Sequence, residues 1–254
     1  MKIYPIYILL LFALASCREP VKNDSMVVAT TSWTAAFAKA AGAKNVVVLA
    51  PFEMQHPSEY EIRAVDIPVI VHAKVIIFAG YETMVKRLQS GMDLKKEVLL
   101  KIDTDYDMAT IEKSVMEIAQ RLGTEKIALQ NLDSIRQIIA DGKAQLERSG
   151  INATPVLVNF FQQSIVKEMG FEVAGVFGPA ALEAGDIDKM AKPASGMIID
   201  NEHNPVGKPL ITVKTGAAYR QLLNFPGAHQ TSTLQDVIRY NIQQLNLPAE
   251  NSKQ

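Results

Sequence analysis

The feature that most constrains the fold is a long helical segment that interrupts a regular alternation of strands and helices. Between residues 26 and 122, short β-branched runs alternate with helical segments, a pattern typical of a mostly parallel sheet. From Thr124 to Arg148, apolar residues recur at steps of three, four or seven without a return to a strand. Such a helix is about 37 Å long at 1.5 Å per residue, more than a crossover in a small sheet needs. We therefore expect a connector between two domains.

The same alternation resumes after this segment, so both halves are expected to be α/β lobes. Strands are predicted at residues 26–30, 46–49, 74–78, 98–102, 155–159, 171–176, 196–200 and 219–223. Helices are predicted at residues 35–41, 60–71, 83–89, 110–122, 162–169, 186–191, 206–215 and 234–245. The expected fold is α/β, with two small lobes (26–123 and 150–248) that each hold a mostly parallel four-stranded sheet, joined by one long rigid connector helix (124–149). Residues 249–254 form a polar tail.

The first residues predict an export signal rather than part of the fold. Lys2 gives a small positive start, and residues 6–15 form an apolar run that is too short to span a membrane comfortably. The run ends in Leu14-Ala15-Ser16-Cys17, which resembles a bacterial lipobox. We expect residues 1–16 to be a signal peptide, Cys17 to be lipidated and residues 17–25 to be a tether. The protein would then be anchored to the bacterial cell membrane, facing the periplasm or the cell exterior; a free core cysteine is the alternative.

Composition and motifs exclude several functions. The chain is 48% hydrophobic and 21% charged with a net charge of −1, so nothing favours nucleic acid as a partner. The sequence lacks a Gly-x-Ser-x-Gly elbow, a phosphate loop and a His-Glu-x-x-His motif. Cys17 is the only cysteine, so no intrachain disulfide can form. We expect a monomeric binding protein that is not an enzyme.

His56 is the first candidate ligand-binding residue. It follows the strand predicted at 46–49, in a loop bracketed by Pro51 and Pro57, and Ser58 and Glu61 then resemble a helix start. In open α/β sheets, ligands bind beyond the carboxyl ends of the strands. Neutral imidazole is also the commonest metal ligand in proteins. The position of His56 therefore indicates a metal-binding loop.

His203 and His229 follow strands of the second half in the same way. If both sheets present their carboxyl ends to one cleft, these two residues can converge with His56, and Glu202 adds a carboxylate suited to zinc or manganese. The alternative is three unrelated histidines in surface loops and an ordinary acidic turn. Asp105 follows the strand predicted at 98–102 and Asn159 ends the strand predicted at 155–159, so both are candidate pocket residues. His72 precedes a strand, which favours a core or helix-end histidine.

Several short motifs, in order along the chain, resemble one family. They are Ala29-Thr30-Thr31-Ser32-Trp33, Gln55-His56-Pro57-Ser58-Glu59-Tyr60, Phe78-Ala79-Gly80-Tyr81-Glu82, Gly170-Phe171-Glu172-Val173 and Tyr240-Asn241-Ile242. With the lipobox and the connector helix, they resemble the cluster A-I substrate-binding lipoproteins of zinc and manganese ABC importers. The resemblance implies two α/β lobes on one backbone helix, a metal between them and an ABC permease as the partner.

The chain departs from the ligand pattern of that family. Only the first histidine stays in place, as His56; the later ligand positions fall near Asp105, Asn159 and Asn224, with His229 close behind the last. The predicted metal ligands are therefore His56, Glu202, His203 and His229, with zinc or manganese as the transported ligand. The alternative function is a surface adhesin or scaffold of the same fold that binds a non-metal ligand.

Overall fold

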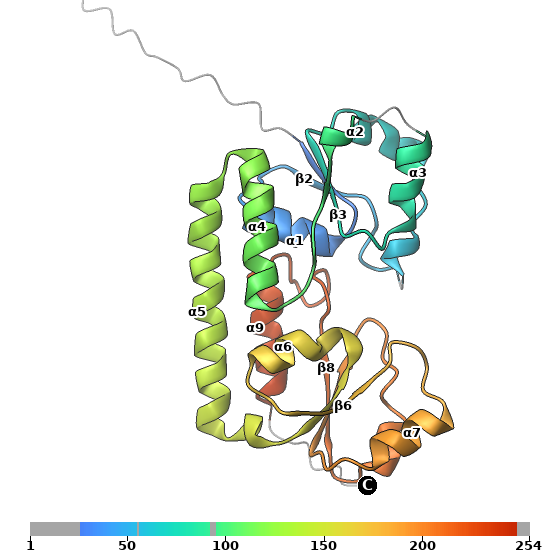
Figure 1. The fold of residues 1–254 in the computed structure, drawn as a ribbon, viewed down its shortest axis with the longest axis vertical. Coiled ribbons are helices and arrows are strands. Elements are labelled where there is room, and N and C mark those ends of the chain that lie inside the picture. The colour runs from blue at the N-terminus through green and yellow to red at the C-terminus, as the bar shows by residue number, and fades with distance from the viewer. Residues whose placement is uncertain (1–25, 55, 92–94, 248–254) are drawn as a thin grey trace, which may run out of the picture.

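Two lobes lie one above the other, and a layer of helices runs along one side of both (Figure 1). The computed structural model describes residues 26–54, 56–91 and 95–247. The predicted signal peptide, Cys17, the tether and the polar tail lie outside these ranges. None of the helices within them is long and apolar enough to cross a membrane.

Each lobe holds one four-stranded parallel sheet, as predicted. The upper sheet has the order β2-β1-β3-β4 and the lower sheet the order β6-β5-β7-β8. The strands of the upper sheet are β1 (Val27–Ala29), β2 (Val46–Val48), β3 (Val75–Phe78) and β4 (Leu99–Lys101). Those of the lower sheet are β5 (Val156–Asn159), β6 (Val173–Phe177), β7 (Met197–Asn201) and β8 (Ala218–Leu222). The central strands β1, β3, β5 and β7 are buried and mostly apolar, because helices or loops cover both of their faces.

Helices connect these strands. The α-helices are α1 (Ser32–Ala40), α2 (Ile67–Val71), α3 (Thr83–Gly91), α4 (Met108–Leu122), α5 (Glu125–Ser149), α6 (Gln163–Glu168), α7 (Ala184–Ala191), α8 (Leu210–Val213) and α9 (Leu234–Leu245). Short 3₁₀ turns are η1 (Pro57–Glu59), η2 (Ala64–Asp66), η3 (Lys96–Val98), η4 (Ile151–Ala153) and η5 (Phe160–Gln162). The predicted connector is α5.

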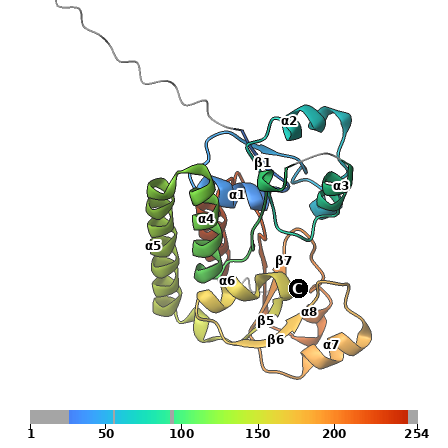
Figure 2. The ribbon, with the colours of Figure 1, turned by 45° about the horizontal axis from the view of Figure 1, so that its top comes forward.

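The helices α4, α5 and α9 form the layer that joins the lobes, and both views show them side by side (Figures 1 and 2). The buried face of α5 repeats at helical spacing and includes Leu132 and Ile135. Gly142 lets α9 approach closely, because a Cβ there would lie 2.3 Å from Cδ1 of Ile242. One apolar cluster runs from Val27 in the upper sheet through this layer to Ile199 in the lower one. A shared core of this kind fixes the two lobes relative to each other.

Two predicted helices are shorter than expected. The helix predicted over residues 60–71 is only α2, preceded by η2, because Pro68 lies in the first turn of α2 and favours a helix start there. The helix predicted over 206–215 is only α8, with Pro209 as its N-cap. Proline positions, more than apolar spacing, set both boundaries.

Two predicted starts were also wrong. The helix predicted over residues 35–41 begins earlier, at Ser32: Thr31 is the N-cap of α1 and forms a capping box with Thr34. Ser58, predicted as a helix cap, lies instead within η1, where His56 is the N-cap and makes no capping hydrogen bond through its side chain.

Candidate functional site

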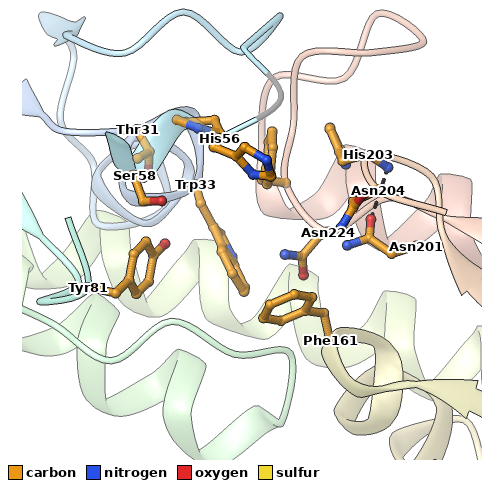
Figure 3. A pocket seen from close by; sticks show the side chains of 12 residues that line it. Thr31, Trp33, His56, Ser58, Tyr81, Phe161, Asn201, His203, Asn204 and Asn224 are labelled. Atoms are coloured by element: carbon orange, nitrogen blue, oxygen red, sulfur yellow. Dashed lines mark hydrogen bonds between the residues drawn. The ribbon is translucent and has the colours of Figure 1, made fainter. Parts of the chain in front are cut away.

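A cavity of about 350 Å³ lies between the lobes, beyond the carboxyl ends of strands from both sheets. Figure 3 shows side chains of the two lobes around it. It is lined by Thr31, Trp33, His56, Pro57, Ser58 and Tyr81 from the upper lobe and by Phe161, Asn201, His203, Asn204, Asn224 and Phe225 from the lower lobe. Asn201 ends β7, and the others lie in loops or first helical turns that follow a strand.

The upper wall is held by a buried carboxylate. Glu82 accepts hydrogen bonds from Thr30 Oγ1 at 2.6 Å, from the Ala79 amide at 2.9 Å and from the Gly80 amide at 2.7 Å. These bonds tie the loop after β3 to the end of β1 and so fix the backbone on either side of Tyr81. The Tyr81 ring is half exposed at the cavity.

Trp33 forms the inner part of the same wall. It lies in the first turn of α1 and stacks on Tyr106, with the ring centroids 5.8 Å apart. Only 8% of Trp33 is exposed, and its Nε1 has no hydrogen-bond partner among the described residues. A buried N–H without an acceptor is rare in folded proteins, and a bound ligand can supply one.

The lower wall depends on a second buried carboxylate, Asp200 at the end of β7. It accepts hydrogen bonds from Asn159 Nδ2 at 3.0 Å, the Asn201 amide at 2.8 Å, the Gly207 amide at 2.6 Å and the Tyr219 hydroxyl at 2.7 Å. These bonds fix the segment that carries the cavity-lining residues at and after the end of β7.

His203 is the histidine best placed for a ligand in this wall. The Asn201 side chain accepts a hydrogen bond from its amide at 3.0 Å, and its ring stacks on Phe225 with centroids 3.7 Å apart. Both ring nitrogens are covered and have no partner among the described residues. Burial lowers the pKa of His203 to about 4, against the opposing effect of the Glu202 charge. The ring is therefore neutral at pH 7, the form that binds metals.

The other two predicted ligands bind each other beside the cavity. His229 Nε2 lies 2.6 Å from Glu202 Oε1, and the Tyr240 hydroxyl donates to Glu202 Oε2 at 3.1 Å. The His229 ring also stacks on Tyr240, with centroids 4.6 Å apart. Burial and the Glu202 charge raise the pKa of Tyr240 to about 12. Neither Glu202 nor His229 lines the cavity.

The four predicted ligands thus form two separate groups. His56 and His203 line the cavity, one from each lobe, whereas Glu202 and His229 are paired outside it. Over residues 26–54, 56–91 and 95–247, no three His, Cys, Asp or Glu side chains gather where they could hold a metal ion. In this structure a metal would have at most two histidines of the predicted set.

The other residues considered in the sequence, Asn159, Asp105 and His72, do not line this cavity. Asn159 is buried, and its side chain is occupied: it donates to Asp200, and its Oδ1 accepts from the Phe161 amide at 3.1 Å. Asp105 accepts from the Tyr106 amide at 2.7 Å and lines a second cavity of about 530 Å³. His72 ends α2, exposed, with Nδ1 2.7 Å from the Pro68 carbonyl oxygen. The helix-end interpretation of His72 therefore fits, and the core one does not.

Sequence reasoning missed much of the cavity wall. Trp33, Tyr81, Phe161, Asn201 and Phe225 all line it, and none was a candidate. The signal that could have found them is the one that found His56, namely their position just after a predicted strand. Histidines and acids were favoured only because their chemistry is more distinctive.

Comparison with known proteins identifies the fold. No family model matches the chain, and no curated protein matches its sequence. Among solved structures, the Mn-bound periplasmic metal-binding protein from Candidatus Liberibacter asiaticus is 15% identical, with a TM-score of 0.64 over 87% of this chain and 98% of that one. The solute-binding protein FpvC of P. aeruginosa, in complex with Ni²⁺, is 17% identical, with a TM-score of 0.68 over 87% of this chain and 94% of that one.

The Liberibacter protein has also been solved bound to Cd, with a TM-score of 0.63 and 15% identity over 87% of this chain and 98% of that one. At such identities the likeness shows the fold alone. The chain has the two-lobed fold of periplasmic metal-binding proteins, which the sequence resemblance predicted.

Proposed function

We propose that this chain, which has the fold of periplasmic metal-binding proteins, captures a divalent transition metal in the cavity between its lobes and delivers it to an ABC importer. The observation that supports this most is His203: its two ring nitrogens are covered, unpaired among the described residues and placed in a cavity that His56 also lines. Imidazole nitrogens that make no other bond are available to bind a metal.

The two histidines come from opposite lobes, so a metal bound to both would bridge them. His56 is exposed. Gly227 of the lower lobe contacts the loop that carries His56, because a Cβ on Gly227 would lie 2.3 Å from the ring of Phe52. We assign His56 and His203 as metal ligands. The Glu202–His229 pair, also predicted to ligate, has the role of holding the segment beside His203 against Tyr240 on α9.

The donor set favours zinc over manganese as cargo. Imidazole nitrogen suits zinc, whereas manganese prefers carboxylate and other oxygen ligands. The described residues that line the cavity include two histidines and no carboxylate.

The rest of the proposal follows from the sequence. Lipidation of Cys17 would anchor the protein to the bacterial membrane, with residues 17–25 as a tether and the lobes facing the periplasm or the cell exterior. The protein would act as a monomeric binding component and not as an enzyme. Its partner would be the permease of a metal importer.

The direct test is metal stoichiometry. Protein stripped with EDTA and dialysed against zinc should retain about one zinc per chain, measured by elemental analysis. The double variant His56→Ala/His203→Ala should retain much less, while His72→Ala, which changes an exposed histidine outside the cavity, should match the wild type. Equal retention in the wild type and the double variant would refute the assignment. No retained zinc or manganese in the wild type would favour the adhesin or scaffold function instead.

A further inference from the structure

The cavity between the lobes is lined by Trp33, whose buried ring N–H a bare cation cannot satisfy. Trp33 Nε1 is a donor and never an acceptor, so it cannot coordinate a metal. Asn224 lines the same cavity, is only 6% exposed and has an Oδ1 without a partner in the described part of the chain. A buried donor or acceptor that is left unpaired loses the hydrogen bonds it makes with water in the unfolded chain, which destabilises the fold. The natural occupant of this cavity therefore brings at least one hydrogen-bond acceptor for Trp33.

The charge of the lining leads to the same conclusion. Among the described residues around the cavity there is no Asp, Glu, Lys or Arg. Glu202 is the nearest acid along the chain to His203, and both its oxygens are engaged, one with His229 and one with Tyr240. A divalent cation held only by side chains without a negative charge would keep its full charge in a partly buried site, which is unfavourable. An occupant that includes its own anionic groups avoids this cost.

The size and shape of the cavity fit a small organic molecule better than an ion. Its volume of about 350 Å³ lies within the usual range for small-molecule sites. Figure 3 shows the rings of Trp33, Tyr81 and Phe161 along one side of it. The same three rings also line the second cavity of about 530 Å³, so the space along them is longer than the first cavity alone. Aromatic faces of this kind favour a flat, partly apolar ligand.

From these observations we infer that the cargo is a divalent metal already complexed by a small, planar, anionic chelator. This inference rests on the proposed function, since the imidazoles of His56 and His203 would complete the coordination of the metal. The chelator would neutralise the metal, accept the hydrogen bond of Trp33 Nε1 and lie against the aromatic rings. Asn224 Oδ1 would accept a hydrogen bond from a hydroxyl or a metal-bound water of the complex.

The test compares zinc alone, the chelator alone and their 1:1 complex. Picolinate and 2,3-dihydroxybenzoate serve as planar anionic probes, and isothermal titration calorimetry gives each Kd for metal-stripped protein. We expect at least one complex to bind tenfold or more tightly than the zinc ion and than its chelator alone. Trp33 is the only tryptophan of the chain, so its fluorescence should also change on binding.

Two variants separate the complex from the ion. Trp33→Phe keeps a ring but removes the donor, and it should raise the Kd of the complex roughly three- to tenfold, as expected for one hydrogen bond. Phe161→Ala, at a residue 39% exposed, should fold normally and also weaken only the complex. Circular dichroism verifies the fold of both variants, and the Kd of the zinc ion should change less than twofold.

The outcomes distinguish this inference from the proposed function. If zinc alone binds as tightly as both complexes and neither variant affects the complexes selectively, the cargo is the bare ion; the inference then fails and the proposed function stands. If neither zinc nor either complex binds, or if the chelators bind equally well without zinc, the proposed function fails as well.

Discussion

The helical layer and the cavity wall meet at α1, but they differ in whether their polar atoms have hydrogen-bond partners. In the layer, the starts of α4 and α9 are capped: Asp107 accepts from the Thr110 amide, and Thr233 and Asp236 accept from each other's amides. At the cavity, Trp33 Nε1, Asn224 Oδ1 and both nitrogens of His203 have no partner among the described residues. The layer is complete by itself, whereas the wall is complete only with a ligand. Stability and binding should therefore depend on different residues.

The largest expected effect is in the core of the layer. Leu132→Ala removes a side chain of α5 that is 1% exposed, and a cavity of this kind costs about 2–5 kcal/mol of unfolding free energy. Leu129→Ala, on the same helix but at a residue 50% exposed, should cost much less. Urea denaturation of both variants measures this. The ligand affinity of folded Leu132→Ala should equal that of the wild type; a large loss of affinity would contradict the separation of the two regions.

The next effect is in the cavity wall. A ligand at a hundredfold excess over its Kd stabilises the folded state by roughly 2.7 kcal/mol. His56→Ala should remove most of the zinc-induced rise in melting temperature and leave the melting temperature in EDTA nearly unchanged, because His56 is exposed. His72→Ala, the matched control, should retain the rise. Equal shifts in the wild type and His56→Ala would exclude His56 as a ligand.

A smaller effect concerns the capped start of α9. Burial tends to raise the pKa of Asp236, but hydrogen bonds from Thr233 and Ser232 outweigh it and hold the pKa below its ordinary value. A carboxyl whose pKa is lower in the folded state contributes stability above its unfolded pKa, near 3.9, and loses it as the pH falls through the folded value. Asp236→Asn should cost about 1 kcal/mol at pH 7, and its stability should fall less steeply than that of the wild type below pH 4. Urea denaturation at pH 7 and pH 3 measures the unfolding free energy of both proteins. An equal loss between the two pH values in the wild type and in Asp236→Asn would contradict this prediction.

The smallest effect is expected on the solvent face of the layer. Arg136 on α5 bonds Glu112 on α4 and Asp133 on its own helix, and all three side chains are at least 40% exposed. Exposed ion pairs contribute little to stability and are screened by salt. Arg136→Gln should therefore lower the unfolding free energy by less than Leu132→Ala does, and 1 M NaCl should remove the difference from the wild type. A loss as large as that of Leu132→Ala would show that the layer depends on charge.

The fold and the connector were predictable because their signals are local. The spacing of Ala128, Leu132 and Ile135 along α5 is a property of the sequence, and so are the β-branched runs that became β1 and β7. The helices predicted over 60–71 and 206–215 are shorter for a local reason as well, because Pro68 and Pro209 set where α2 and α8 begin.

The candidate site was predictable only in outline. Position after a strand placed His56 and His203 at the carboxyl ends of the sheets, and the structure has both in one cavity. The sequence could not show that His229 bonds Glu202 under Tyr240, or that the Asn159 side chain donates to Asp200. Each of these pairs joins residues 27 to 41 positions apart. Strand order and helix packing decide such neighbours, and with them which polar atoms stay unpaired for a ligand.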